Sequence, residues 1–234
     1  MFPHRPFAPS DGKDRSRSAR RRLLEEIARE ARETGAWTGR PAFAQRVMGA
    51  IAAVPREEFA AFGPTEAAYV NAPYAIGYGQ TISQPYIVAL MTDFLDPAAN
   101  HVVLEIGTGS GYQAAVLSLL VRRVYSIEIV APLAAAAGAR LARLGYDNVE
   151  VRQGDGARGW PEHAPYDGII VTAAAPEVPP ALVAQLRPGG RMVIPLGYPG
   201  ESQMLVLVTR DVDGRVTQRD LLAVAFVPLT GEPS

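Results

Sequence analysis

The sequence predicts an α/β fold built on a doubly wound, mostly parallel sheet with helices on both faces. From about residue 86, short apolar segments alternate with amphipathic ones at the spacing that strands and helices have in such a sheet. Near the end of the chain the alternation stops, and two strand-like segments are joined by Asp213-Gly214, a hairpin turn signal. We therefore expect a C-terminal antiparallel hairpin to complete the parallel sheet, and additional helices at the N-terminus.

The first third of the chain is less regular. Residues 1–18 mix Pro, Ser, Asp and Arg without apolar periodicity, which predicts a disordered basic tail over residues 1–21. Apolar residues at helical spacing predict one helix over residues 22–33 and a second between Pro41 and Pro55. Residues 55–85 are rich in Pro, Gly and Tyr without a clean period, and we expect an irregular, functional loop there.

The elements of the regular part follow in order. Three of the helices begin with a proline, which suits the first turn, and the strands are short runs rich in Val, Ile and Leu. Helices are expected over residues 85–95, 112–120, 132–144 and 179–186. Strands are expected over residues 102–106, 124–127, 149–152, 168–171, 192–196, 204–209 and 221–227, with a turn at 188–190. Residues 22–85 and 86–234 should form one compact domain.

The composition excludes several kinds of chemistry. The chain has no cysteine, so a thiolate nucleophile, a thiolate metal site and a disulfide are ruled out. Its one lysine, Lys13, lies in the expected tail, which argues against a Schiff base. The histidines His4, His101 and His163 share no ligand-like spacing, so we expect no metal.

Charge and hydropathy indicate the setting. The net charge is −1, but residues 1–22 carry +5 and the rest of the chain about −6, which argues against a nucleic-acid-binding body. A nucleic-acid-binding arm remains an alternative for the tail. The sequence has no apolar run of about 18 residues and no signal-peptide pattern, so we expect a cytoplasmic protein without a membrane partner.

A glycine cluster lies where the strand over residues 102–106 precedes a helix. Glycines there let the backbone turn sharply and approach a ligand, and the helix start offers free N–H groups. The spacing is Gly-x-Gly-x-Gly over Gly107, Thr108, Gly109 and Gly111, whereas a dinucleotide fingerprint needs glycine where the chain has Tyr112. A purely structural turn is the alternative interpretation.

Three acids accompany this turn at the ends of successive strands. Glu105 precedes the glycines, Glu128 ends the second strand 21 residues after Gly107, and Asp155 follows the third strand, before Gly156. Each alone could be a solvated charge or a helix cap, but ligands of open α/β sheets bind at this edge. Glu128 can accept both ribose hydroxyls and Asp155 an adenine amino proton. Without Lys or Arg in the loop, the ligand is a nucleoside that lacks pyrophosphate, and S-adenosylmethionine fits.

Several motifs together resemble one known family. The most specific is Gly-Gln-Thr-Ile-Ser-Gln-Pro-Tyr at residues 79–86, inside the irregular stretch. Others lie at residues 54–59, 164–167, 171–175, 185–190 and 227–229. From about Ala53 to Thr230, the chain resembles the protein-L-isoaspartate (D-aspartate) O-methyltransferases. Two departures are Tyr74-Ala75-Ile76-Gly77, where the family usually has Leu-Pro-Ile-Gly, and a longer, more basic N-terminus.

The resemblance implies a Rossmann-like methyltransferase that transfers a methyl group from S-adenosylmethionine to the free carboxylate of isoaspartyl residues in damaged proteins, which starts their repair and leaves S-adenosylhomocysteine. It implies that Ser83 is catalytic and that no metal is needed. The cofactor would be bound by Gln80, Thr81, Ile82, Ser83, Glu105, Gly107, Thr108, Gly109, Gly111, Glu128, Asp155, Gly156 and Thr230.

The expected mechanism needs no base, because a carboxylate of pKa about 4 is already ionised at neutral pH. Ser83 would orient it; the alternative is that Ser83 only caps the helix at Pro85.

Competing functions are a peptide-tailoring aspartate O-methyltransferase of the same fold, a small-molecule or nucleic-acid methyltransferase, and a nucleotide-binding module. An amine methyltransferase generally has Asn-Pro-Pro-Tyr where this chain has residues 172–175. We expect a monomer that acts on isoaspartyl proteins and binds no nucleic acid.

Overall fold

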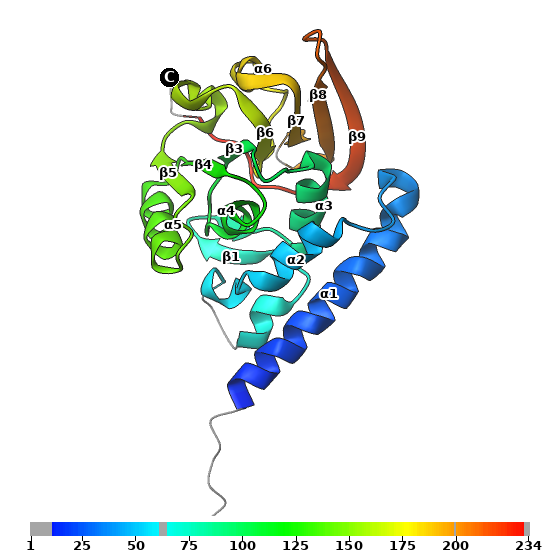
Figure 1. The fold of residues 1–234 in the computed structure, drawn as a ribbon, viewed down its shortest axis with the longest axis vertical. Helices are drawn as coiled ribbons and strands as arrows, with labels where there is room; N and C mark the ends of the chain where they lie inside the picture. Colours follow the sequence, from blue (N-terminus) through cyan, green and yellow to red (C-terminus); the bar gives the residue numbers. More distant parts are fainter. Residues whose placement is uncertain (1–10, 61–64, 199, 232–234) are drawn as a thin grey trace, which may run out of the picture.

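The computed structural model describes residues 11–60, 65–198 and 200–231. Its centre is a seven-stranded sheet of order β5-β4-β3-β6-β7-β8-β9 (Figure 1). The strands are β3 (Val102–Ile106), β4 (Arg123–Glu128), β5 (Val149–Gln153), β6 (Tyr166–Val171), β7 (Leu186–Leu196), β8 (Gln203–Arg210) and β9 (Val216–Val224). The first five in this order pair in parallel, and β8 and β9 add an antiparallel hairpin. The predicted fold class is confirmed.

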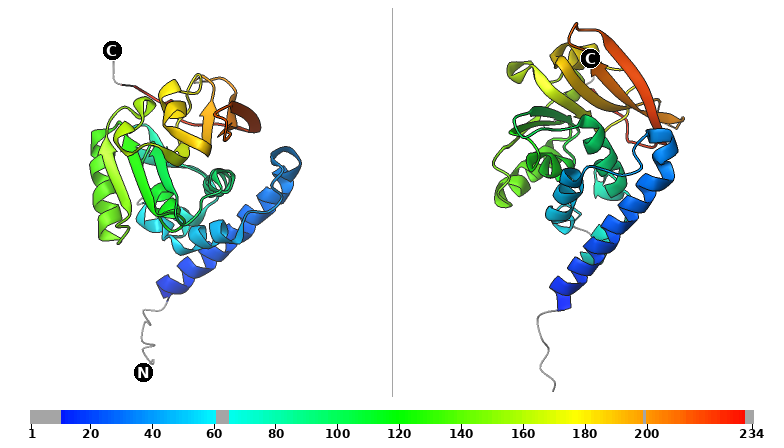
Figure 2. Two further views of the ribbon diagram at one scale, coloured as in Figure 1. Left: turned by 45° about the horizontal axis from the view of Figure 1, so that its top comes forward. Right: turned by 45° about the vertical axis from the view of Figure 1, so that its right-hand side comes forward.

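Helices cover both faces of this sheet. They are α1 (Asp11–Thr38), α2 (Gln45–Ala53), α3 (Pro85–Leu95), α4 (Tyr112–Ser118), α5 (Ala131–Arg143) and α6 (Pro180–Gln185). Figure 2 shows α5 beside β5 at one edge, while the long α1 runs along the opposite side of the molecule and reaches β9. The helices from α3 onward begin within one residue of the predicted positions.

The sheet separates two hydrophobic cores, and alternate residues of β3 belong to one core or the other. Val103 packs into a core with α1 to α4, whereas Leu104 and Ile106 point into a second core with Trp160 and Leu182. The first core contains residues from Ala19 to Leu221, so the N-terminal helices and the sheet share it. Both faces of β3 are covered, and accordingly all of its residues except Glu105 are apolar.

The N-terminal helix corrects the predicted tail. Residues 11–21 belong to α1, so the expectation of a disordered segment is wrong for them, while residues 1–10 lie outside the described residues. Ala19 is buried on the same stripe as Leu23 and Ile27, and Arg20 donates hydrogen bonds to the Tyr69 hydroxyl and the Ala52 carbonyl. The apolar period therefore begins earlier than the surrounding charges suggest.

The stretch over residues 55–85 also contains regular elements that were not predicted. They are the short 3₁₀ helices η1 (Arg56–Glu58) and η2 (Thr65–Tyr69) and an antiparallel hairpin of β1 (Tyr74–Gly77) and β2 (Gln80–Ile82). Tyr78 and Gly79, with φ of 54° and 71°, form the two-residue turn between the strands. A second difference is that residues 188–190 lie inside β7, at an irregularity in its pairing with β6, rather than in a separate turn.

Candidate functional site

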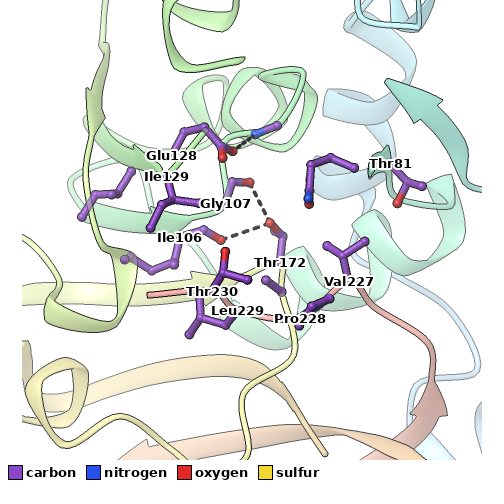
Figure 3. A pocket seen from close by; sticks show the side chains of 15 residues that line it. Thr81, Ile106, Gly107, Glu128, Ile129, Thr172, Val227, Pro228, Leu229 and Thr230 are labelled. Atoms are coloured by element: carbon purple, nitrogen blue, oxygen red, sulfur yellow. Dashed lines mark hydrogen bonds between the residues drawn. The ribbon is translucent and has the colours of Figure 1, made fainter. Parts of the chain in front are cut away.

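The site lies where the strand order reverses. The chain leaves β3 towards β4 and β5 and returns to β6 on the other side of β3, so the carboxyl ends of β3 and β6 lie side by side. Gly107 follows β3 and Thr172 follows β6. The Thr172 hydroxyl donates to the carbonyls of Gly107 at 2.7 Å and Ile106 at 3.0 Å (Figure 3). A Cβ on Gly107 would lie 2.4 Å from this hydroxyl, and its φ of +91° is strained for other residues, so only glycine fits.

A hollow of about 490 Å³ opens at this edge, and Figure 3 shows the residues around it. Seven of the residues predicted to bind the cofactor line it: Gln80, Thr81, Gly107, Gly109, Glu128, Gly156 and Thr230. Eight further lining residues were not predicted from the sequence: Ile106, Ile127, Ile129, Thr172, Ala173, Val227, Pro228 and Leu229. The wall is thus largely apolar, with hydroxyl groups and one carboxylate.

That carboxylate belongs to Glu128, which is 5% exposed at the end of β4. Its Oε2 accepts the backbone N–H of Gly109 at 2.7 Å, and its Oε1 accepts that of Val130 at 2.9 Å. These two hydrogen bonds fix the glycine loop against β4 and leave further lone pairs on the carboxylate for a ligand in the hollow.

Three predicted residues support the loop instead of lining the hollow. Glu105 is fully buried, and one of its carboxylate oxygens accepts the Ser126 hydroxyl, which also bonds Thr108. Burial raises the pKa of Glu105 to about 8, against the opposing effect of the Ser126 hydrogen bond. Its other oxygen has no hydrogen-bond partner among the described residues. Gly111 precedes the first turn of α4 and faces Leu141.

Asp155 lies at the rim, but its carboxylate bonds to its own segment. Oδ1 accepts the Ala157 N–H at 2.9 Å, and Oδ2 lies 3.5 Å from the Arg158 guanidinium. Its neighbour Gly156 lines the hollow, and a Cβ there would lie 2.2 Å from the Ile106 side chain. The backbone at this position therefore packs tightly against Ile106, another residue that lines the hollow, while the contact from Asp155 to an adenine stays a prediction.

A second depression, the Ser83 groove, adjoins the hollow and spans about 1060 Å³, part of it open to solvent. Thr81, Thr172 and Val227 line both spaces and so form their common wall. Ser83 lines the groove and also a smaller space of about 290 Å³ between the glycine loop and Ile82. A ligand in the hollow and one in the groove would meet at this wall.

The backbone before α3 is held by a buried cation. Arg56 is 1% exposed; its Nη2 donates to the Ser83 carbonyl at 2.8 Å, and its Nε donates to the Ala68 carbonyl at 2.9 Å. Its guanidinium lies 4.6 Å from the centre of the Tyr112 ring, and burial lowers the pKa of Arg56. The segment that carries Ser83 is therefore braced from behind.

The Ser83 hydroxyl itself has no hydrogen-bond partner in the part of the chain that the structure describes. The N-cap of α3 is Gln84, and no side chain makes a capping hydrogen bond there. The interpretation of Ser83 as a helix cap is therefore wrong, and its hydroxyl is available to a ligand in the groove.

Two of the unpredicted parts of the hollow, Thr172 and the C-terminal segment, differ in whether the sequence contains a signal for them. Thr172 ends a fourth parallel strand, so the rule that located Glu128 could have found it. Residues 227–229 instead cross back over the sheet edge, where the Ala174 N–H donates to the Val227 carbonyl at 2.8 Å and the Leu229 N–H to the Ala174 carbonyl at 2.7 Å. Only the family resemblance pointed to this part of the chain, through the motif at residues 227–229 and through Thr230, and no periodicity or turn signal predicts its return to the site.

The helices described here include none that is long and apolar enough to cross a membrane. Nor do the described residues bring three His, Asp or Glu side chains together as a metal site would require.

This chain is similar to known proteins over most of its length. The model of the family "Protein-L-isoaspartate(D-aspartate) O-methyltransferase" matches residues 37–234. Protein-L-isoaspartate O-methyltransferase 2 of Syntrophobacter fumaroxidans is 58% identical over 214 residues, which are 92% of this chain and 87% of that protein. Its namesake from Polaromonas is 57% identical over 210 residues, 90% of this chain and 100% of that protein.

Solved structures agree with these sequence matches. A structure of a protein-L-isoaspartate O-methyltransferase has a TM-score of 0.79 at 30% identity, and covers 91% of this chain and 66% of its own. A putative protein-L-isoaspartate O-methyltransferase from Plasmodium falciparum, solved in complex with S-adenosyl-L-homocysteine, has a TM-score of 0.72 at 24% identity over 89% of this chain and 97% of its own. The latter shares the fold.

Proposed function

Since the chain belongs to the protein-L-isoaspartate(D-aspartate) O-methyltransferase family, we propose that the hollow binds the methyl donor and the Ser83 groove binds the isoaspartyl side chain. The protein is an S-adenosylmethionine-dependent O-methyltransferase for isoaspartyl residues in proteins. One observation supports the placement above all: Thr81 and Thr172 line both spaces, so donor and acceptor would meet there.

The hollow fits S-adenosylmethionine by its donor set and its shape. A Cβ at Gly107 or Gly156 would collide with the side chain of Thr172 or Ile106, so at these two positions bare backbone borders the hollow. Glu128 offers a carboxylate suited to ribose hydroxyls, and the apolar walls suit an adenine. No Lys or Arg is among the described residues that line the hollow, as expected for a ligand without phosphate.

When bound, the cofactor supplies an electrophilic methyl group on its sulfonium. The residues of this chain position the acceptor rather than activate it, because the isoaspartyl carboxylate is ionised at neutral pH. Ser83 donates a hydrogen bond to that carboxylate, and Arg56 holds the Ser83 backbone in place. In-line positioning of this kind contributes up to roughly 7–11 kcal/mol to lowering a barrier.

We also propose that the protein acts as a cytoplasmic monomer without nucleic-acid or membrane partners. The charge of about −6 outside residues 1–22 supports this, since such a body repels polyanions. Light scattering on the purified protein tests the monomer, with twice the chain mass as the contradicting result.

The function is tested with methyl-labelled cofactor and two peptides that differ only in an isoaspartyl or a normal aspartyl residue. We expect transfer to the isoaspartyl peptide alone. Methylation of the normal aspartyl peptide instead would favour the peptide-tailoring alternative, and label on neither would contradict the proposed acceptor.

A further inference from the structure

The Ser83 groove contains a charged side chain for which the methyl transfer has no evident use. Among the described residues that line it, Glu30 is the only charged one, and its neighbours there include Pro73, Ile87 and Phe226. Glu30 lies on α1, outside residues 37–234 that match the family model. The charge therefore reaches the groove from the N-terminal helix that packs against the methyltransferase core, on the right of Figure 1.

The Glu30 carboxylate is held in place but not neutralised. The Asn71 amide donates to its Oε2 at 2.7 Å, and the Gln84 amide donates to both oxygens at 3.1 and 3.2 Å. Asn71 in turn accepts the backbone N–H of Tyr86 at 3.0 Å. No Lys, Arg or His of the described residues lies within ion-pair distance of Glu30. Burial raises the pKa of Glu30, and the opposing effects of the two amide hydrogen bonds and of the Arg29 charge do not cancel this rise.

Gln84 connects this charge to the reaction site. It follows Ser83 directly, so Glu30 and the Ser83 hydroxyl border one groove and share its occupant. A peptide that places its isoaspartyl carboxylate at Ser83 would bring its neighbouring residues towards Glu30. A fixed, half-buried carboxylate attracts a cation and repels an anion in the groove.

We propose that Glu30 is a specificity residue that favours isoaspartyl substrates carrying a lysine or arginine side chain close to the isoaspartyl residue, and disfavours those carrying an acid. This inference rests on the proposed function, because it assumes that the groove binds the substrate. It assigns to α1 a part in choosing among damaged proteins.

The test uses isoaspartyl peptides of one sequence with lysine, glutamine or glutamate at each of two positions on either side of the isoaspartyl residue. We expect kcat/KM at one or more positions to rank lysine above glutamine above glutamate, with about three- to tenfold between lysine and glutamine. In Glu30→Gln, which keeps an acceptor for Asn71 and Gln84, the ranking should collapse to within about twofold. Glu33→Gln is the matched control: it lies on the same helix, 64% exposed beside Arg29, and should keep the ranking.

Two further measurements keep the outcome decisive. Raising the ionic strength should lower the ratio of kcat/KM for the lysine peptide to that for the glutamine peptide in the unmodified protein. This measurement does not depend on whether a variant folds. Equal kcat/KM across the charge series, or a uniform loss in Glu30→Gln with the ranking intact, would overturn the inference and leave Glu30 a structural acceptor. Absence of methylation on every isoaspartyl peptide would instead contradict the proposed function.

Discussion

At the scale of single residues, the free hydroxyl of Ser83 is the group closest to the expected chemistry. It lines the groove without a partner among the described residues, on a backbone braced by Arg56. Because it would orient an ionised carboxylate, we expect Ser83→Ala to lower turnover of an isoaspartyl peptide by roughly 100-fold. Calorimetry should show a much smaller change in cofactor affinity.

Ser83→Thr provides the control for this prediction, since it keeps the hydroxyl and adds one methyl group. It should retain part of the activity. Turnover should show no new dependence on pH in the basic range in either variant, because the reaction of the parent enzyme removes no proton from Ser83. If Ser83→Ala turned over at the parent rate, the hydroxyl would have no role in catalysis, which would then depend on enclosure of the site and on backbone contacts.

Glu128 is the residue whose removal we expect to weaken cofactor binding most directly. Its removal loses a charged acceptor in the hollow and also frees the N–H groups of Gly109 and Val130. A hydrogen bond to a charged group is worth about 1.5–3 kcal/mol, so Glu128→Ala should raise the Kd for S-adenosylhomocysteine by roughly 10- to 150-fold. Titration calorimetry measures this directly, and an unchanged Kd would remove Glu128 from the site.

At the scale of elements, Arg56 connects η1, η2 and the segment before α3. Arg56→Met keeps the apolar volume but leaves the carbonyls of Ala68 and Ser83 without their donor. We expect the free energy of unfolding to fall by about 2–3 kcal/mol and kcat to fall about tenfold as Ser83 loosens, with little change in cofactor Kd.

The surface variant Arg143→Met is a matched control, because this arginine is 59% exposed and pairs only with Glu58 among the described residues. Its effect on stability should stay within about 0.5 kcal/mol. Urea unfolding and steady-state kinetics separate the two effects in both variants. A fall in stability without a change in kcat would show that Arg56 only holds the fold.

At the scale of the whole molecule, the N-terminal helix belongs to the folded body. Deleting residues 1–21 removes buried Ala19 and the hydrogen bonds of Arg20 to Tyr69 and Ala52. We expect a loss of about 2–4 kcal/mol in the free energy of unfolding, although the sequence alone predicted a disordered tail over these residues. Thermal unfolding compares this truncation with deletion of residues 1–10, which should be the milder change. Equal melting temperatures would contradict the structural role of residues 11–21.

The core of this fold could be predicted because its signals are local. Strands buried on both faces are short apolar runs, and a glycine turn after one of them marks the sheet edge at which ligands bind. The hairpin of β1 and β2 could not be predicted, since its residues are mostly exposed and lack an apolar alternation. The start of α1 was hidden for a related reason, because one buried face is masked by the charges on the other.

By itself, the sequence determined the sheet, the carboxyl-edge position of Gly107 and Glu128, and the resemblance that pointed to Ser83. Tertiary structure alone decided which groups face a ligand. It turned the Asp155 carboxylate to its own segment, placed Glu105 under the glycine loop, and brought residues 227–229 to the hollow beside Thr230. The physical reason is that periodicity and turn chemistry act over a few residues, whereas a site is assembled where distant segments pack together.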